Sequence, residues 1–480
     1  ELQPEPYSET IYFKQYVNKK IWKIEDIKES KDSIKCIMKY FSLYKAGSIL
    51  LIAFLLQACA TPMDMGSARL AYDSGDYIAA SNHYREQAAL GNTEAEFMLG
   101  EVYAKGQGIP QNQSEAMKWY KSAADKNHLQ AQVELANAYL KNENYAEARN
   151  YFERAANSNN ATAQFNLGYF YQNALGVSRD FNRAIDFYKQ AANANNGAAQ
   201  YYLSELYRNG QGINQNLREA DILLARSAQN GYGEAQYALA INPDNQNISA
   251  EQNIIWMKSA ADQGVMQAQY NMGNAYLDGN GAEADIEQAF KYYSLAAEQG
   301  LSNAQYKLGN LYRQDQGIER DYDQALKWYR NASDQNHRDA QYDLAAMYYI
   351  GVGVSANIKE AIKWYTLSAE KGHPIAQYIL GNIHRTGQGV VVDEAEALKW
   401  YKLSAEQNVP EAQTNLGYMY SNGQGVTKNY PLAHMWFSIS VANDNLSAQN
   451  SKLFIETEMT KEQIAQAISM ADEWLADHGL

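Results

Sequence analysis

Apolar residues recur along most of the chain with the period of an α-helix. In one stretch Ala376, Leu380 and His384 stand four residues apart. At 100° per residue such positions form one narrow stripe on a helix. After a Gly-x-Gly turn, Ala397 and Trp400 open a second set at i, i+3, i+4, i+7 and i+8. That spacing is typical of a core-facing helix, so the stretch predicts a helical hairpin.

The hairpin pattern is repeated along the chain. Its opening alanines stand 32, 33 or 36 residues apart, and nearly all precede Gln: Ala95, Ala131, Ala163, Ala199, Ala235, Ala268, Ala304, Ala340, Ala376 and Ala412. Self-similarity of this kind is typical of solenoids. The pattern therefore predicts an all-α protein, an α-solenoid of about eleven antiparallel helix-pair repeats over residues 67–445. Residues 446–480 predict a C-terminal helical cap, with helices at 446–456 and 461–477 and a capping box formed by Thr460 and Gln463.

The repeated pattern AxxxLGxxYxxGxGVxxDxxxAxxWYxxAA resembles the Sel1-like repeat family, a longer relative of the tetratricopeptide repeat. The resemblance covers roughly residues 67–445 and implies a right-handed superhelix. Two repeats depart from the pattern. The one at 131–162 has no Gly-x-Gly loop, and the one that opens at Ala235 has Asn242-Pro243-Asp244 in its place.

The N-terminal region has the pattern of an export signal. Residues 38–45 form a short segment with positive charge, and residues 46–56 form an apolar run that is too short to span a bilayer. Leu56-Gln57-Ala58-Cys59 follows and resembles the lipobox of bacterial lipoproteins. We therefore expect 38–58 to be a signal peptide, Cys59 to be lipidated, and 59–66 to be a linker. Residues 1–37 read as an upstream extension from a mis-assigned start. Ala60 favours a periplasm-facing position at the outer membrane in that family.

Charge and motif content argue against several functions. The formal net charge of -14 disfavours binding to nucleic acid. The chain has two cysteines, Cys36 and Cys59, so a mature chain that begins at Cys59 has no pair for a disulfide. No metalloprotease, nucleophile-elbow, phosphate-loop or paired-cysteine motif is present. We therefore predict no catalytic residues, no metal and no cofactor. His128, His337 and His373 precede first helices, where solvated turn histidines are expected in preference to a metal bridge.

Positions two, six and nine residues after the opening Ala face away from the apolar stripe. In relatives of the tetratricopeptide repeat they line the binding groove. The second position is mostly aromatic, and the ninth includes three arginines; the predicted partner-binding residues are Phe97, Phe165, Tyr201, Tyr237, Tyr270, Tyr306, Tyr342, Tyr378, Arg208, Arg313 and Arg385. The sixth is often polar, as in Glu101, Asn274, Asn310 and Asn382. The alternative is that these aromatic rings only pack between helices. The sequence does not distinguish a peptide ligand from a glycan.

These features predict a non-catalytic, lipid-anchored interaction scaffold of the cell envelope. Residues 68–101 resemble the start of lipoproteins that assemble alginate-type exopolysaccharide secretion complexes. That resemblance implies an outer-membrane β-barrel exporter and periplasmic polysaccharide enzymes as partners. One alternative is a secreted or surface-exposed factor that acts on host cells. A second is a hydrolase such as a β-lactamase-like protein, for which the chain has no serine-lysine motif.

Overall fold

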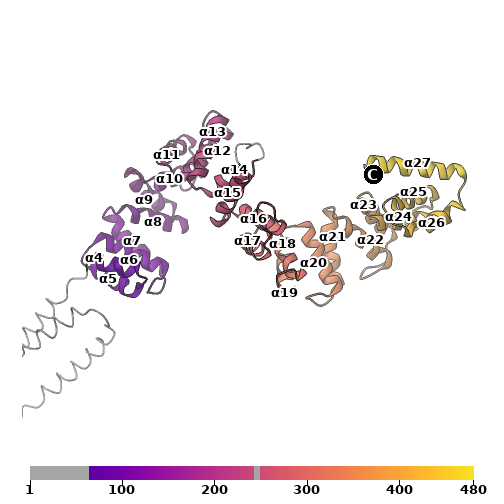
Figure 1. Ribbon diagram of the computed structural model, residues 1–480, viewed down its shortest axis with the longest axis horizontal. Coiled ribbons are helices and arrows are strands. Elements are labelled where there is room, and N and C mark those ends of the chain that lie inside the picture. The colour runs from indigo at the N-terminus through magenta and orange to yellow at the C-terminus, as the bar shows by residue number, and fades with distance from the viewer. Residues whose placement is uncertain (1–63, 243–248, 480) are drawn as a thin grey trace, which may run out of the picture. The chain divides into compact units, whose positions relative to one another are not determined.

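A computed structural model describes residues 64–242 and 249–479 of the chain. Within these residues it contains 24 α-helices and no strand, which confirms the predicted α-solenoid. The chain divides into two compact blocks, an N-terminal block up to Asp180 and a C-terminal block from Phe181 onward. In each block, successive helices pack against their neighbours in chain order (Figure 1).

The helices alternate between two roles, as the sequence pattern predicts. The first helices carry the opening Ala: α4 (Met65–Asp73), α6 (Thr93–Lys105), α8 (Leu129–Lys141), α10 (Ala161–Asn173), α12 (Gly197–Asn209), α14 (Gly233–Ala240), α16 (Met266–Asp278), α18 (Ser302–Gln314), α20 (Arg338–Ile350), α22 (Pro374–Thr386), α24 (Pro410–Asn422) and α26 (Ser447–Glu456). The second helices are α5 (Tyr77–Ala89), α7 (Gln113–Asp125), α9 (Tyr145–Asn157), α11 (Phe181–Asn193), α13 (Leu217–Gln229), α15 (Ala250–Asp262), α17 (Ile286–Glu298), α19 (Tyr322–Asp334), α21 (Ile358–Glu370), α23 (Glu394–Ala405), α25 (Tyr430–Ala442) and α27 (Lys461–Asp477).

Local sequence sets the bounds of the helices. Gly387 ends α22 in the left-handed region (φ 74°), where a residue without a side chain is favoured. Asp393 then caps α23 by accepting a hydrogen bond from the backbone N–H of Glu396 (2.9 Å). Its own N–H donates to the carbonyl of His384 (2.9 Å), which closes the loop between the two helices.

Small residues let the two helices of a repeat approach closely. Ala376 and Ala397 are fully buried. Gly381 faces the ring of Tyr401 so closely that a Cβ on Gly381 would lie 2.5 Å from it. The ring of Tyr401 therefore lies against the backbone of Gly381. Dense packing of this kind holds the two helices of the repeat together.

Buried glutamines join neighbouring repeats. Gln377 donates from Nε2 to the carbonyl of Ala369 (3.0 Å), and its Oε1 accepts from Gln407 (2.7 Å). In the first full repeat an ion pair replaces this contact, with Glu96 buried and 2.8 Å from the Lys126 ammonium. Both polar atoms of the Gln377 carboxamide thus have partners, whereas Glu96 engages Oε1 and leaves Oε2 buried without one.

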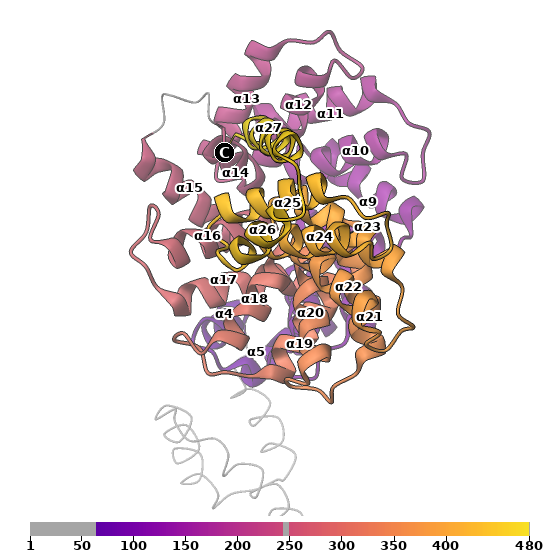
Figure 2. The ribbon, with the colours of Figure 1, turned by 90° about the vertical axis from the view of Figure 1, so that its right-hand side faces the viewer.

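The C-terminal cap continues the register of the repeats further than the sequence analysis expected. Ala448, on α26, lies 36 residues after Ala412 and is fully buried like the other opening alanines. Leu453 stands five residues later, where Gly417 in the preceding repeat touches the ring of its second helix. The larger side chain excludes that close pairing, and both α26 and α27 pack on α25 (Figure 2). The predicted capping box at Thr460 is present at the start of α27.

The N-terminal predictions fall outside the described residues. These are the extension at 1–37, the signal peptide at 38–58, Cys59, and most of the linker at 59–66. Among the helices that the structure describes, none combines the length and the hydropathy needed to cross a membrane.

Candidate functional site

The aromatic residues two positions after the opening Ala are half-buried on the first helices. Their rings pack against the second-helix aromatic ring of the same repeat, with centroids 5.8–6.2 Å apart in five repeats: Phe97–Tyr120, Tyr270–Tyr293, Tyr306–Tyr329, Tyr342–Tyr365 and Tyr378–Tyr401. Phe165, Tyr201 and Tyr237 are half-buried at the same position of their own helices. Each ring therefore stabilises its helix pair and keeps part of its surface exposed.

Several of these rings also reach the next repeat. Tyr342 stacks on His373 with centroids 4.3 Å apart, and Tyr306 stacks on His337 at 4.8 Å. Phe97 stacks in the same way on His128 at 4.7 Å. The histidines thus pack between repeats as well as capping helices.

The polar residues at the sixth position are oriented by second-helix tyrosines. The hydroxyl of Tyr329 donates to Oδ1 of Asn310 (2.6 Å), and that of Tyr401 donates to Oδ1 of Asn382 (2.7 Å). Because Oδ1 is engaged, each carboxamide presents its Nδ2 hydrogens to a partner. Burial raises the pKa of both tyrosines, so they stay neutral donors.

The three arginines at the ninth position each contact another side chain of this chain. Arg208 pairs with Asp221 (2.9 Å), and Arg313 lies 3.6 Å from the buried carboxylate of Asp343. Burial raises the pKa of Asp343, and Arg313 opposes that shift. Arg385 is exposed and donates from Nε to the hydroxyl of Tyr401 (3.1 Å).

The second-helix tyrosine organises the candidate groove, although the sequence analysis placed it only in the core. Around Tyr329 the structure brings together Tyr306, Asn310 and Arg313, whose guanidinium lies 6.0 Å from the ring centroid. The signal was present in the sequence, since this Tyr stands 19 residues after the sixth-position Asn in several repeats. The groove assignment itself stays a prediction.

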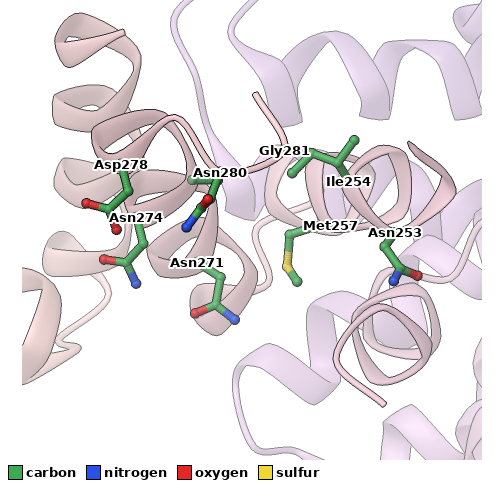
Figure 3. A pocket seen from close by; sticks show the side chains of 9 residues that line it. Asn253, Ile254, Met257, Asn271, Asn274, Asp278, Asn280 and Gly281 are labelled. Atoms are coloured by element: carbon green, nitrogen blue, oxygen red, sulfur yellow. The ribbon is translucent and has the colours of Figure 1, made fainter. Parts of the chain in front are cut away.

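The structure also contains a pocket that the sequence analysis did not predict. Its cavity volume is about 370 Å³, and it lies between α15 and α16 in the C-terminal block. Figure 3 shows its lining: Asn253, Ile254 and Met257 come from α15, whereas Asn271, Asn274, Asp278 and Asn280 come from α16 and the loop that follows it. The preceding first helix, α14, has 8 residues in place of the usual 13, and it belongs to the degenerate repeat.

Two core positions of this repeat depart from the common pattern. Asn253 stands where the ten other second helices from α5 to α25 have a fully buried Ala, such as Ala289 and Ala325. Met257 stands where most have a large aromatic ring, such as Tyr293. The Oδ1 atom of Asn253 is buried and has no hydrogen-bond partner among the described residues. The break in the Ala pattern was the sequence signal that marks this pocket.

No group of three or more His, Cys, Asp or Glu side chains that could hold a metal ion occurs in the part of the chain that the structure describes. His337 and His373, the two histidines in successive repeats, each engage Nδ1 with a backbone N–H (3.2 Å in both). That atom is therefore used for helix capping.

Comparison with known families places the chain among Sel1 repeat proteins. The Sel1 repeat model matches ten segments: residues 93–128, 129–160, 161–196, 197–232, 249–265, 267–301, 302–337, 338–373, 374–409 and 410–445. These segments span well over half of the chain, so it belongs to the Sel1 repeat family, as the sequence resemblance predicts.

One solved structure agrees with this assignment, and a second is similar in sequence. A protective antigen of uropathogenic Escherichia coli strains that displays an SLR fold is 30% identical, with a TM-score of 0.55, over 86% of this chain and 91% of that one. A Sel1 repeat protein from Oxalobacter formigenes is 31% identical over 62% of this chain and 87% of that one, with a TM-score of 0.43. No curated protein matches the chain.

Proposed function

We propose that this chain is a non-catalytic, membrane-tethered scaffold for protein–protein interaction in the cell envelope. The observation that carries the proposal is the repeated cluster of a half-buried aromatic ring, an oriented carboxamide and an arginine on the first helices, as at Tyr306, Asn310 and Arg313. A surface that recurs along a solenoid suits an extended partner, and aromatic and arginine side chains are common at binding hot spots.

The groove can be tested with two exposed cations of equal charge on one repeat. Arg385→Gln removes a ninth-position guanidinium, whereas Lys399→Gln removes an exposed ammonium on the second helix. We expect Arg385→Gln to reduce the yield of crosslinked envelope partners and Lys399→Gln to leave it unchanged. Equal yields for both variants would contradict the groove assignment.

The tether is proposed to be a lipid on Cys59, with the protein at the outer membrane and facing the periplasm. The apolar run at 46–56, which ends three residues before Cys59, supports this. Cys59→Ser should abolish incorporation of a labelled fatty acid and release the protein into the soluble fraction. Thr61→Ser, in the predicted linker of the mature chain, is the matched control and should change neither. Fatty-acid labelling that survives Cys59→Ser would refute the tether.

The more specific version of the proposal is assembly of an exopolysaccharide secretion complex. Its partners would be an outer-membrane β-barrel exporter and periplasmic polysaccharide enzymes. The support is the resemblance of residues 68–101 to lipoproteins of such complexes. Loss of exported polymer on deletion of the protein, with restoration by the wild-type chain and not by Cys59→Ser, is the expected result.

A surface-exposed, host-directed role is the second candidate. The E. coli relative is described as a protective antigen, which is the observation that favours it. Treating intact cells with a protease separates the two roles, since a periplasm-facing protein is protected. Digestion on intact cells would favour the second candidate.

A further inference from the structure

We propose that α26 is the surface through which two copies of this chain pair, with their α26 helices antiparallel. The proposal starts from an incomplete repeat. In ten helix pairs from α4 to α25 the first helix packs against the second helix that follows it, whereas α27 folds back and packs on α25 (Figure 2). Among the described residues, α26 is therefore a first helix without the usual second helix on its partner face.

A stripe of exposed, uncharged residues runs along this open face: Leu446, Asn450, Leu453, Phe454 and Thr457. Leu446 is 73% exposed and Phe454 is 68% exposed. At 100° per residue the stripe lies opposite Ala448 and Ile455, which are buried in the core cluster that contains α25. Terminal units of a solenoid need a polar outer face to stay in solution, so an apolar stripe here indicates a contact surface.

The centre of the stripe excludes the kind of helix that packs on the other first helices. In ten repeats the position five residues after the opening Ala holds Gly, Ala or Ser. A ring of the second helix lies against five of these glycines, as Tyr401 does against Gly381. In α26 this position is Leu453, which keeps such a ring away from the backbone. The occupant must therefore interlock its side chains with those of the stripe.

The order of residues along the stripe fits a second copy of α26. A two-fold axis midway between Leu453 and Phe454 makes the two helices antiparallel, which is also the relation between the helices of a repeat. Leu453 of each copy then faces Phe454 of the other, and Asn450 faces Thr457. The Thr457 hydroxyl donates its hydrogen to the carbonyl of Phe454 (2.6 Å), so its oxygen can accept from the Asn450 carboxamide. Apolar side chains thus meet apolar ones, and polar side chains meet polar ones.

The charge of the stripe permits two acidic chains to meet. The chain has a formal net charge of -14, and like charges in contact oppose association. The stripe contains no Asp, Glu, Lys or Arg, so no charged side chain has to lose water in this contact. A contact between single helices is smaller than a standard protein interface. We therefore expect a weak dimer whose population rises with concentration.

The inference goes beyond the scaffold function and does not depend on it. Pairing through α26 needs neither the lipid on Cys59 nor an envelope partner. The two proposals can therefore fail separately, because a monomeric chain would still recover envelope partners, and loss of those partners would leave the dimer intact.

Sedimentation velocity measures the association directly. The full chain carries Cys36→Ser and Cys59→Ser, which leave no native thiol. We expect the mean sedimentation coefficient to rise from the monomer to the dimer value as the concentration increases. Phe454→Gln should raise the dissociation constant about tenfold, because each copy loses a ring from the contact. Val391→Gln is the matched control and should leave it unchanged, since Val391 is an apolar residue of an exposed loop in the same block.

Disulfide formation between single-cysteine variants tests the antiparallel register. In the same background, Asn450→Cys and Thr457→Cys should crosslink when the two variants are mixed, because these positions face each other across the axis. Each variant alone should crosslink much more slowly. The two copies of one position lie about 10 Å apart along the helices, which is beyond the reach of a disulfide.

Three results would overturn the proposal. They are a chain that stays monomeric at every concentration, a dimer that Phe454→Gln leaves intact, and a cysteine variant that crosslinks with itself as fast as with the other. Because Phe454 is exposed, Phe454→Gln should melt at the same temperature as the parent chain at low concentration, so weaker association cannot be ascribed to unfolding. Leu453→Gln changes a second exposed residue of the stripe and should weaken the dimer in the same way.

Discussion

Two helix N-termini in the C-terminal block depend on neutral histidine. Nδ1 of His337 accepts the backbone N–H of Ala340, and Nδ1 of His373 accepts that of Ala376, both at 3.2 Å. Protonation of Nδ1 removes the acceptor and with it the cap. Each N-cap contributes about 1 kcal/mol to the free energy of unfolding, so losing both costs about 2 kcal/mol.

The sign of the pH dependence follows from burial. Burial lowers the pKa of His337 and His373 from the ordinary 6.5, with the carboxylate of Asp339 opposing the shift and Arg338 adding to it. The unfolded chain therefore binds these protons more readily than the folded one. The stabilisation is complete above pH 6.5 and is lost as the pH falls toward the lower folded values. At roughly 2 °C per kcal/mol for a block of this size, the melting temperature should fall by about 4 °C.

The test compares thermal unfolding at pH 7.5 and pH 5.0 in the wild type and in His337→Asn/His373→Asn. The chain itself supplies the control, because Asn92, Asn160 and Asn196 cap equivalent helices with N–H contacts of 2.9–3.1 Å. The double variant keeps the caps but loses the stacking on Tyr306 and Tyr342, so it should be less stable than the wild type at pH 7.5. It should nevertheless lose less of its stability than the wild type between pH 7.5 and pH 5.0. An identical pH dependence in the two proteins would refute the reasoning.

Two further substitutions probe the packing and the contacts between repeats. Gly381→Ala would place a Cβ 2.5 Å from the ring of Tyr401, and it should lower the free energy of unfolding by about 1–3 kcal/mol in denaturant titrations. Lys126→Ala leaves the buried carboxylate of Glu96 without its cation and should cost about 1–3 kcal/mol. Adding Glu96→Gln should recover most of that loss, and a double variant no more stable than Lys126→Ala would contradict the ion-pair account.

Much of the fold could be predicted from the sequence because one helix-pair pattern is repeated along the chain. The same spacing of Ala, Gly and Tyr recurs in ten matched segments, so local propensity and core pattern agree throughout. A residue such as Asp393 predicts the start of a second helix because its side chain can cap only that end.

The features that the sequence did not predict depend on contacts between repeats. The pattern identifies His373 as a turn residue, but its stacking on Tyr342 needs the spacing between helices. Asn253 is visible as an exception in the sequence, whereas its unpaired Oδ1 atom and the cavity beside it exist only in three dimensions. Cys59 lies outside the described residues, so its role rests on sequence alone.

A crosslinked pull-down from intact envelopes, with the chain tagged at Leu480, tests the central claim most directly. The account predicts recovery of a β-barrel exporter together with periplasmic polysaccharide enzymes, and a reduced yield of both with Arg385→Gln. Recovery of no envelope protein, or of an unrelated set that Arg385→Gln leaves unchanged, would contradict it.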